Sequence, residues 1–279
     1  MKISIVIPVY NEAESLGACL EAISRQTIKP HEVIVVDNNS TDGTARLAQS
    51  FDFVTLLAEK RQGVVHARNR GFDAAHGDII ARIDADSILP ADWLASVHGI
   101  FGSSRVGAVS GAPHYYDFPL AKLADAIDMP LRARLARKLG STNFLWGANM
   151  ALRKSAWKSV RQELCAQGGM HEDFDLAIHL QRSGFIVVYD ETLLANVSSR
   201  RIDTTFAAYV RYTLVSPRTY AIHGLKSRRH MYPVLAVCWL LYLPARLIYR
   251  SYDPQTGSFS VSQLLAANTS RIDPTTNII

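Results

Sequence analysis

The segment Arg82-Ile83-Asp84-Ala85-Asp86 carries the side chains best suited to chemistry in this chain. It closes an apolar run, 79–83, that is typical of a short buried strand. Two carboxylates one residue apart therefore follow a strand end, the place where open α/β sheets bind ligands. Such a pair suits a hard divalent cation that holds a diphosphate. The alternative interpretation is a solvated turn of aspartates before Pro90.

Polar groups also follow the other strands that the sequence predicts in its first half, over 3–7, 33–36 and 53–57. Helical patterns lie between the strands, and this alternation favours a mostly parallel, doubly wound sheet. Because parallel strands end at one edge of a sheet, we expect these polar groups to converge. They are Pro8, Tyr10 and Glu12 after the first strand, Asp37 and Asn39 after the second, and Lys60 and Arg68 after the third.

The strand–helix alternation stops after a strand expected at 106–110. Residues 112–145 contain three prolines and a basic stretch, and we interpret them as an insertion with one amphipathic helix. The later elements that the sequence predicts are a strand-like segment over 147–152, a helix over 174–183 that ends at Gly184, and a strand over 185–189.

Composition excludes several classes of protein. The net charge of +5 over 279 residues is mild, and no DNA- or RNA-binding motif is present, so we expect no nucleic-acid partner. Cys19, Cys165 and Cys238 are odd in number and far apart, which favours a reducing compartment over a disulfide framework. The first ten residues fit a strand better than a secretory signal, so we expect a cytoplasmic location.

Five segments together resemble the family 2 glycosyltransferases of the GT-A fold. They are 5–12 (IVIPVYNE), 36–43 (VDNNSTDG), 67–71 (ARNRG), 84–86 (DAD) and 147–151 (GANMA), and 171–176 (HEDFDL) matches the family's later Glu-Asp motif. The resemblance covers about residues 2 to 195. It implies an α/β, Rossmann-like GT-A domain over 1–199, with a nucleotide-sugar half at 1–111 and an acceptor half at 112–199. Residues 200–279 would form a helical, partly apolar extension.

The resemblance also implies an activity: a sugar moves from a UDP- or GDP-sugar to an acceptor with inversion, usually with Mn²⁺ or Mg²⁺. Asp173 would be the general base, with Glu172 beside it, and Asp86 would bind the metal. The nucleotide sugar would contact Pro8, Tyr10, Glu12, Asp37, Asn39, Lys60, Arg68, Asp84, Ala85 and Asp86. The acceptor, a glycan or glycolipid, would contact Trp146, Gly147 and Asn149.

Several of these residues also have structural interpretations. An Asx turn that caps a helix at Thr44 is the alternative interpretation of Asp37 and the favoured interpretation of Asp42. Arg68 is able to pair with Asp73 or Glu59 on the surface. Two alternative functions remain. The acceptor is a polyprenyl phosphate instead of a hydroxyl group, or the protein is a catalytically inactive scaffold that binds a nucleotide sugar.

The sequence departs from the processive members of the family. These carry a Gln-x-x-Arg-Trp motif after the base, whereas residues 208–212 (AYVRY) keep only the arginine and an aromatic residue. We therefore expect limited rather than processive sugar addition.

A basic and apolar tail suggests a membrane contact over 226–250. Basic residues flank the apolar run 231–243, which is shorter than the ~20 residues of a spanning helix and is bracketed by Pro233 and Pro244. This pattern predicts a helix lying in the inner face of the cell membrane. The alternatives are a helix packed on the core or a contact in a homo-oligomer.

Overall fold

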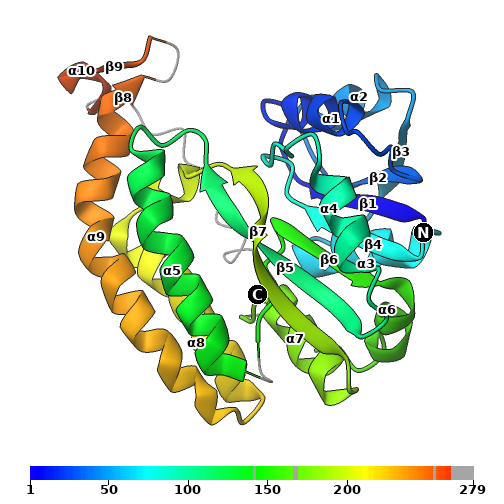
Figure 1. Ribbon diagram of the computed structural model, residues 1–279. Helices are drawn as coiled ribbons and strands as arrows, with labels where there is room; N and C mark the ends of the chain where they lie inside the picture. The colour runs from blue at the N-terminus through cyan, green and yellow to red at the C-terminus, as the bar shows by residue number, and fades with distance from the viewer. Residues whose placement is uncertain (141–142, 166–168, 254–255, 265–279) are drawn as a thin grey trace.

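The computed structural model describes residues 1–140, 143–165, 169–253 and 256–264. Its core is a seven-stranded sheet with the strand order β3-β2-β1-β4-β6-β5-β7 (Figure 1). The strands are β1 (Ile3–Val9), β2 (Glu32–Asp37), β3 (Val54–Ala58), β4 (Ile79–Ile83), β5 (Val106–Tyr115), β6 (Asn149–Arg153) and β7 (Ile186–Val197).

The sheet is mostly parallel, as the sequence predicts. Strands β1 to β4 run in one direction, and β6 is antiparallel to both of its neighbours. Val9 pairs with Asp37, and Asp37 pairs with Ala58, so the carboxyl ends of the first three strands are level. The polar residues that follow these strands consequently share one edge of the sheet.

Helices cover both faces of the sheet, because successive side chains of a strand point to opposite faces. Ile5 and Ile7 pack in one core cluster, and Val6 packs in the other. The first cluster includes side chains of α1 (Leu16–Ser24) and α4 (Trp93–Ile100). The second includes α3 (Val64–Ala74), α6 (Lys154–Val160) and α7 (Glu172–Arg182). The short α2 (Thr44–Gln49) lies between β2 and β3.

Strands β5 and β7 are longer than the sequence predicts. They pair in parallel as far as Tyr115 and Val197, with a register shift after Gly111. Residues 112–115 therefore extend the sheet instead of beginning an insertion, and the expected boundary at 111 falls inside β5. Gly111 permits the close approach of the strands, because a Cβ there would collide with the Leu193 carbonyl oxygen. No local pattern in the sequence reports such a pairing.

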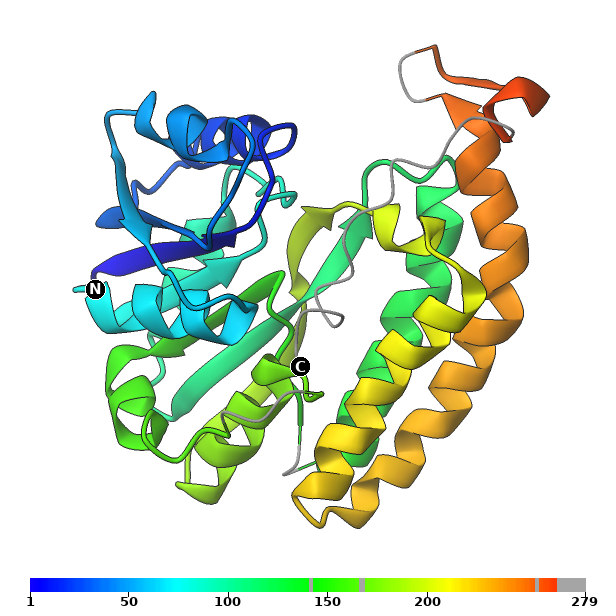
Figure 2. The same cartoon turned by 180° about the vertical axis from the view of Figure 1, so that it is seen from behind.

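Three long helices lie side by side next to the sheet (Figures 1 and 2). They are α5 (Ala121–Leu139), α8 (Phe206–Ile222) and α9 (Met231–Ser251). Helix α5 is the single helix expected in the insertion. Two 3₁₀ turns, η2 (Arg200–Asp203) and η3 (Lys226–His230), connect β7 to α8 and α8 to α9. A small hairpin, β8 (Tyr252–Asp253) with β9 (Ser258–Phe259), and α10 (Val261–Leu264) follow.

Helix α9 is longer than the run that the sequence defines. Pro233 lies in its first turn, where a missing N–H costs no hydrogen bond, and Pro244 lies inside it. The two prolines that bracket the apolar run therefore do not mark the ends of the helix. Within the described residues, the segment Lys226–Ser251 is long and apolar enough to cross a membrane, with 17% of its most apolar window buried. Length and composition alone do not separate such a helix from one that packs on a core.

Candidate active site

A pocket of about 750 Å³ lies at the carboxyl ends of β1, β2 and β4. It extends to the start of α7 and to η2, so it brings together segments from residue 8 to residue 249. The residues predicted from the sequence that line it are Pro8, Tyr10, Glu12, Asp84, Ala85, Trp146, Gly147, Glu172 and Asp173. The expected convergence of these side chains at one edge of the sheet is thus observed.

Asp173 lies in the first turn of α7 and is 7% exposed. Its Oδ2 accepts a hydrogen bond from the backbone N–H of Gly147 at 2.9 Å, and its Oδ1 accepts one from the N–H of Phe174 at 2.8 Å. Burial and the neighbouring Glu172 carboxylate raise the pKa of Asp173. A carboxylate in this position is held firmly and has an increased affinity for a proton.

Glu172 is in different surroundings although it is the adjacent residue. Arg82 on β4 donates a hydrogen bond from Nη1 to Glu172 Oε1 at 2.8 Å. Burial alone would raise the pKa of Glu172, but Arg82 and Arg68 more than offset this effect and lower it. The two carboxylates are therefore differentiated: Glu172 is paired with Arg82 and has a lowered pKa, whereas Asp173 has a raised pKa.

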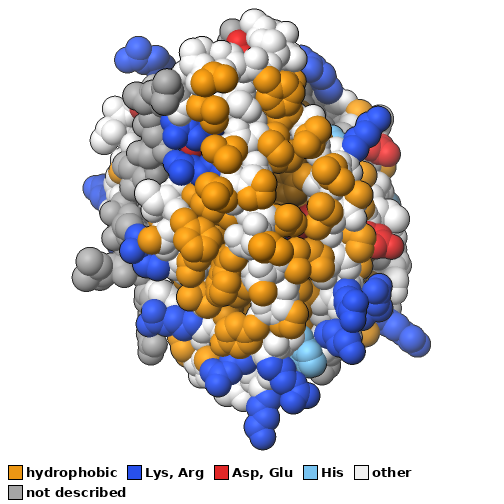
Figure 3. Space-filling view, turned by 90° about the vertical axis from the view of Figure 1, so that its left-hand side faces the viewer, with side chains coloured by type: hydrophobic (Ala, Val, Ile, Leu, Met, Phe, Trp, Pro, Cys, Tyr) orange, Lys and Arg blue, Asp and Glu red, His pale blue; other side chains and the backbone are white. Residues whose placement is uncertain are grey.

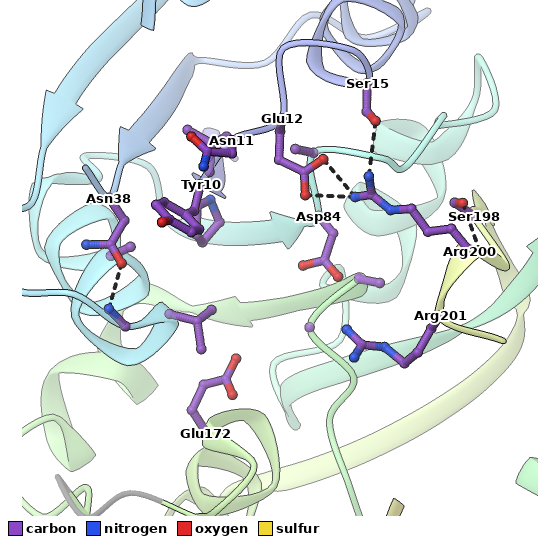
Figure 4. A pocket seen from close by; sticks show the side chains of 18 of the residues that line it. Tyr10, Asn11, Glu12, Ser15, Asn38, Asp84, Glu172, Ser198, Arg200 and Arg201 are labelled. Carbon is purple, nitrogen blue, oxygen red and sulfur yellow. Dashed lines mark hydrogen bonds and ion pairs between the residues drawn. The ribbon is translucent and has the colours of Figure 1, made fainter. Parts of the chain in front are cut away.

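Arg200 of η2 holds two predicted donor-site carboxylates at once. Its Nη2 lies 2.7 Å from both carboxylate oxygens of Glu12, and its Nε lies 2.8 Å from Asp86 Oδ2. Both acidic side chains are largely buried, with 7% and 8% of their surface exposed. Figure 4 shows the Arg200 guanidinium beside Glu12, with Asp84 and Arg201 facing the same opening.

Three further residues that line the pocket are not among the contact residues predicted from the sequence. Arg201 stacks over the ring of Tyr212 at 3.9 Å, and His171 contacts that ring edge-on. All three line the pocket. Tyr212 is the aromatic residue of the 208–212 segment, and the adjacent arginines 200 and 201 after the last strand were the available signal.

Among the predicted contact residues that do not line the pocket, Asn149 and Arg68 are buried in the fold, and these two predictions require correction. Asn149 is fully buried; its amide donates to the carbonyls of Ala112 and Leu193 and its oxygen accepts from Trp93 Nε1. It joins strands and does not face an acceptor. Arg68 is 1% exposed, and its Nη1 donates to the Glu172 carbonyl at 2.7 Å. Neither the donor contact nor the surface ion pairs expected for Arg68 fit this position.

The loop after β2 is organised mainly by its own polar side chains. Asp37 Oδ1 accepts from the Ser40 N–H, and the amide of Asn39 donates to the Lys60 carbonyl. None of Asp37, Asn39 and Lys60 lines the pocket, whereas the intervening Asn38 does.

Asp42 has the structural role considered as its alternative. Its carboxylate accepts from the N–H groups of Thr44, at the start of α2, and Ala13. It therefore links the loops after β1 and β2, although it also borders the pocket.

The acidic residues that follow β4 carry carboxylate oxygens of the kind that bind a divalent cation. Asp84 lines the pocket with its side chain 38% exposed. Asp86 lies deeper and contacts Arg200. Hard oxygen ligands of this kind suit Mg²⁺ and Mn²⁺. The carboxylates of Asp84 and Asp86 fit such an ion. Coordination by Asp86 would compete with its ion pair to Arg200.

The family model described as Glycosyl transferase family 2 matches residues 4–161, which include β1 to β6 and most of the pocket. The chain therefore belongs to glycosyltransferase family 2. Curated relatives include the glycosyltransferase AglE of Haloferax volcanii, 30% identical over 165 residues, 57% of this chain and 54% of the relative. A PGL/p-HBAD biosynthesis glycosyltransferase of Mycobacterium bovis is 40% identical over 105 residues, 36% of this chain and 41% of the relative. The chain thus matches about half, or less, of the length of these relatives.

Solved structures share the fold. The mannosyltransferase PcManGT from Pyrobaculum calidifontis, in complex with GDP-Man and Mn²⁺, aligns with a TM-score of 0.64 and 24% identity, over 95% of this chain and 78% of that one. Glucosyl-3-phosphoglycerate synthase from Mycobacterium tuberculosis, in complex with Mn²⁺, UDP and glucosyl-3-phosphoglycerate, aligns with a TM-score of 0.55 and 20% identity, over 80% of each chain. The expected GT-A fold is confirmed.

Proposed function

We propose that this protein is an inverting glycosyltransferase that moves one sugar from a UDP- or GDP-sugar to a hydroxyl group of a glycan or glycolipid. The observation that carries the proposal is the contrast between Glu172 and Asp173 in a pocket that also contains Asp84. One carboxylate is neutralised by Arg82, and the other has a raised pKa and faces the same space. A single base is what a one-step displacement with inversion requires.

The donor would occupy the end of the pocket formed by β1, β2 and β4. Pro8, Tyr10 and Asn38 line this part and suit a base and ribose. Asp84 and Asp86 would hold a divalent cation, which neutralises the charge that develops on a diphosphate leaving group. Solved relatives in complex with GDP-Man and Mn²⁺, and with UDP and Mn²⁺, support a nucleotide-sugar donor and this metal.

Asp173 would accept the proton of the attacking hydroxyl as the new glycosidic bond forms. Its hydrogen bonds to two backbone N–H groups fix the orientation of the carboxylate. The acceptor would bind beside Trp146, whose ring contacts Arg132 at 4.6 Å, and Tyr212, whose ring contacts Arg201. Aromatic faces of this kind suit the apolar side of a sugar ring.

The acceptor side of the molecule suggests a lipid-linked substrate at an anionic membrane surface, and we propose peripheral binding through α9. Figure 3 shows hydrophobic side chains gathered over this face, with lysines and arginines at its margin. The exposed large hydrophobic residues of α9 are Tyr232, Leu240, Leu241, Leu243 and Leu247. The adjoining η3 has exposed Lys226, Arg228 and Arg229, which suit anionic lipid heads.

A donor screen tests the proposed activity. Purified protein with Mn²⁺ is incubated with a panel of UDP- and GDP-sugars, and release of the nucleoside diphosphate is measured with and without glycolipid acceptors. We expect turnover of a restricted set of donors, and loss of about 10²–10⁴-fold in kcat on Asp173→Asn, the usual contribution of a general base. Asp52→Asn, an exposed aspartate remote from the pocket, is the matched control.

Two outcomes would count against the proposal. If no nucleotide sugar is hydrolysed or transferred, the catalytic assignment is wrong and a binding scaffold is favoured. If Asp173→Asn retains most of its activity, the acceptor oxygen is already anionic, as in a polyprenyl phosphate, because an anion needs no base.

A further inference from the structure

Four potential metal ligands gather outside the pocket, where α7 packs against α8. They are Cys165, which follows α6, Asp175 and His179 on α7, and His223, which directly follows α8. One ligand atom from each lies within 4.8 Å of the others. We propose that this cluster is a structural zinc site that fastens the C-terminal helices to the catalytic domain.

The distances within the cluster suit one small cation. His223 Nε2 lies 2.8 Å from Asp175 Oδ1, His179 Nε2 lies 3.5 Å from the same oxygen, and Cys165 Sγ lies 3.9 Å from His179 Nε2. Ligand atoms of a tetrahedral zinc ion are about 3.3 to 3.6 Å apart, as its bond lengths require. Small shifts of the side chains would therefore place all four around one ion.

The chemistry of the ligands selects zinc. One thiolate, two imidazoles and one carboxylate form a mixed sulfur and nitrogen set, whereas Mg²⁺ and Mn²⁺ prefer oxygen ligands. The charges also balance, because a thiolate and a carboxylate together neutralise one Zn²⁺. That balance matters here, since Asp175 is 1% and His179 is 8% exposed.

The second nitrogen of each imidazole has its own partner. His179 Nδ1 faces Glu163 Oε2 at 3.7 Å, and such outer carboxylates orient histidine ligands. Arg182 Nη1 lies 3.1 Å from His223 Nδ1. A zinc-bound His223 needs a proton on Nδ1, so this contact must open. Arg182 is exposed and keeps its bond to the His223 carbonyl at 2.9 Å, so the move is small.

The site would couple the two parts of the molecule. Cys165 and the α7 residues belong to the sheet domain, and His223 begins the connection to α9. Bound metal adds its binding free energy to folding, because the unfolded chain does not hold the four ligands together. The expected role is mechanical, since these four residues do not line the pocket.

Metal titration of the full chain tests this proposal. Protein stripped of metal is titrated with Zn²⁺ against a coloured chelator, and with Co²⁺ while thiolate-to-metal absorption is recorded. We expect one zinc ion per chain, a cobalt thiolate band and a rise in Tm with zinc. Asp86→Ala should leave all three unchanged, which separates this site from the proposed donor-site metal and from the activity.

Matched cysteine variants identify the ligand. Cys165→Ser should lose the cobalt thiolate band and weaken zinc binding at least about 100-fold, since losing even an outer partner of a ligand costs about 10–100-fold. Cys238→Ser, in α9, should change neither. Absence of a thiolate band in the wild type, or equal zinc affinity in Cys165→Ser, would overturn the proposal and leave a hydrogen-bond network without metal. If Cys165→Ser does not fold, the presence or absence of the thiolate band in the cobalt spectrum of the wild type decides whether Cys165 is a ligand.

Discussion

At the scale of single residues, Arg82 decides how two adjacent acids differ. Its guanidinium pairs with Glu172 and also lies 3.4 Å from Asp84. It packs over Gly147, where any Cβ would collide with the guanidinium group. The absence of a side chain at residue 147 thus allows one backbone segment to contact Arg82 and to donate its N–H to Asp173. Gly147 shapes the site through its lack of a side chain and through its backbone N–H.

The raised pKa of Asp173 predicts a pH dependence. A protonated Asp173 cannot accept a proton, so kcat/KM should fall on acidification through a pKa that lies above the usual range of an aspartate. Glu172→Gln removes a negative charge beside Asp173 and leaves Arg82 with Asp84 as its remaining carboxylate partner. Both effects lower the pKa of Asp173, so the acidic limb of the pH profile should move to lower pH.

The pH profile of kcat/KM for wild type and Glu172→Gln provides the measurement. Asp52→Asn serves again as a control, because its charge is exposed and remote from the pocket. An acidic limb that stays in place, or that moves to higher pH in Glu172→Gln, would show that Asp173 is not the titrating base.

At the scale of elements, η2 connects the loops that follow β1 and β4 through an ion-pair network. Arg200 joins Glu12, which follows β1, to Asp86, which follows β4. Breaking a buried ion pair by removing one partner costs about 3–5 kcal/mol, because the remaining charge is left unneutralised. The ion pairs of Arg200 therefore link the free energy of unfolding to Asp86, one of the carboxylates that would bind a metal.

Arg200→Gln should lower Tm in the absence of metal, because Glu12 and Asp86 lose their shared cation. Mn²⁺ should then raise the Tm of this variant more than that of the wild type, since the ion no longer competes with a guanidinium. Thermal unfolding with and without Mn²⁺ measures both effects. Arg201→Gln is the matched control, because the adjacent Arg201 stacks on Tyr212 instead. Equal Mn²⁺ responses in the two variants would exclude competition at Asp86.

At the scale of the whole molecule, a sheet domain stands beside three long helices, and the pocket includes residues of both (Figure 2). Tyr212 of α8 and Tyr249 of α9 line it. A surface that held α9 would therefore lie close to the opening where the acceptor is proposed to enter. Such an arrangement suits an acceptor whose lipid part stays in a membrane.

Leu240→Glu combined with Leu243→Glu should weaken binding to vesicles that contain anionic lipids. These leucines are 78% and 60% exposed, so the changes should leave the fold intact. Each buried leucine contributes about 1.5–3 kcal/mol, so the loss should exceed about tenfold. Vesicle sedimentation measures it, with Ile28→Glu, exposed but remote from α9, as the control. Equal binding by all three proteins would exclude α9 as the contact.

The sequence by itself determined the sheet and the position of its polar edge. The continuous apolar run Ile5-Val6-Ile7 specifies a strand buried on both faces. The acids that follow the parallel strands must share one edge of the sheet. These signals are local or follow from a general rule of topology, so they predict that Asp84 shares an edge with the polar residues that follow the other strands. The place of Asp173 beside them was implied by the resemblance to family 2 glycosyltransferases.

Only the tertiary structure decided which of these side chains face the pocket and which partners they have. Arg200 and Glu12 are 188 residues apart, and Arg68 and Glu172 are 104 apart, so no periodicity in the chain reports their contacts. Asn149 and Arg68 are buried and form hydrogen bonds within the fold. Packing of α7 against α8 brings Cys165 and His223 together. A contact between remote residues depends on the full set of packed elements, and that set exists only when the chain has folded.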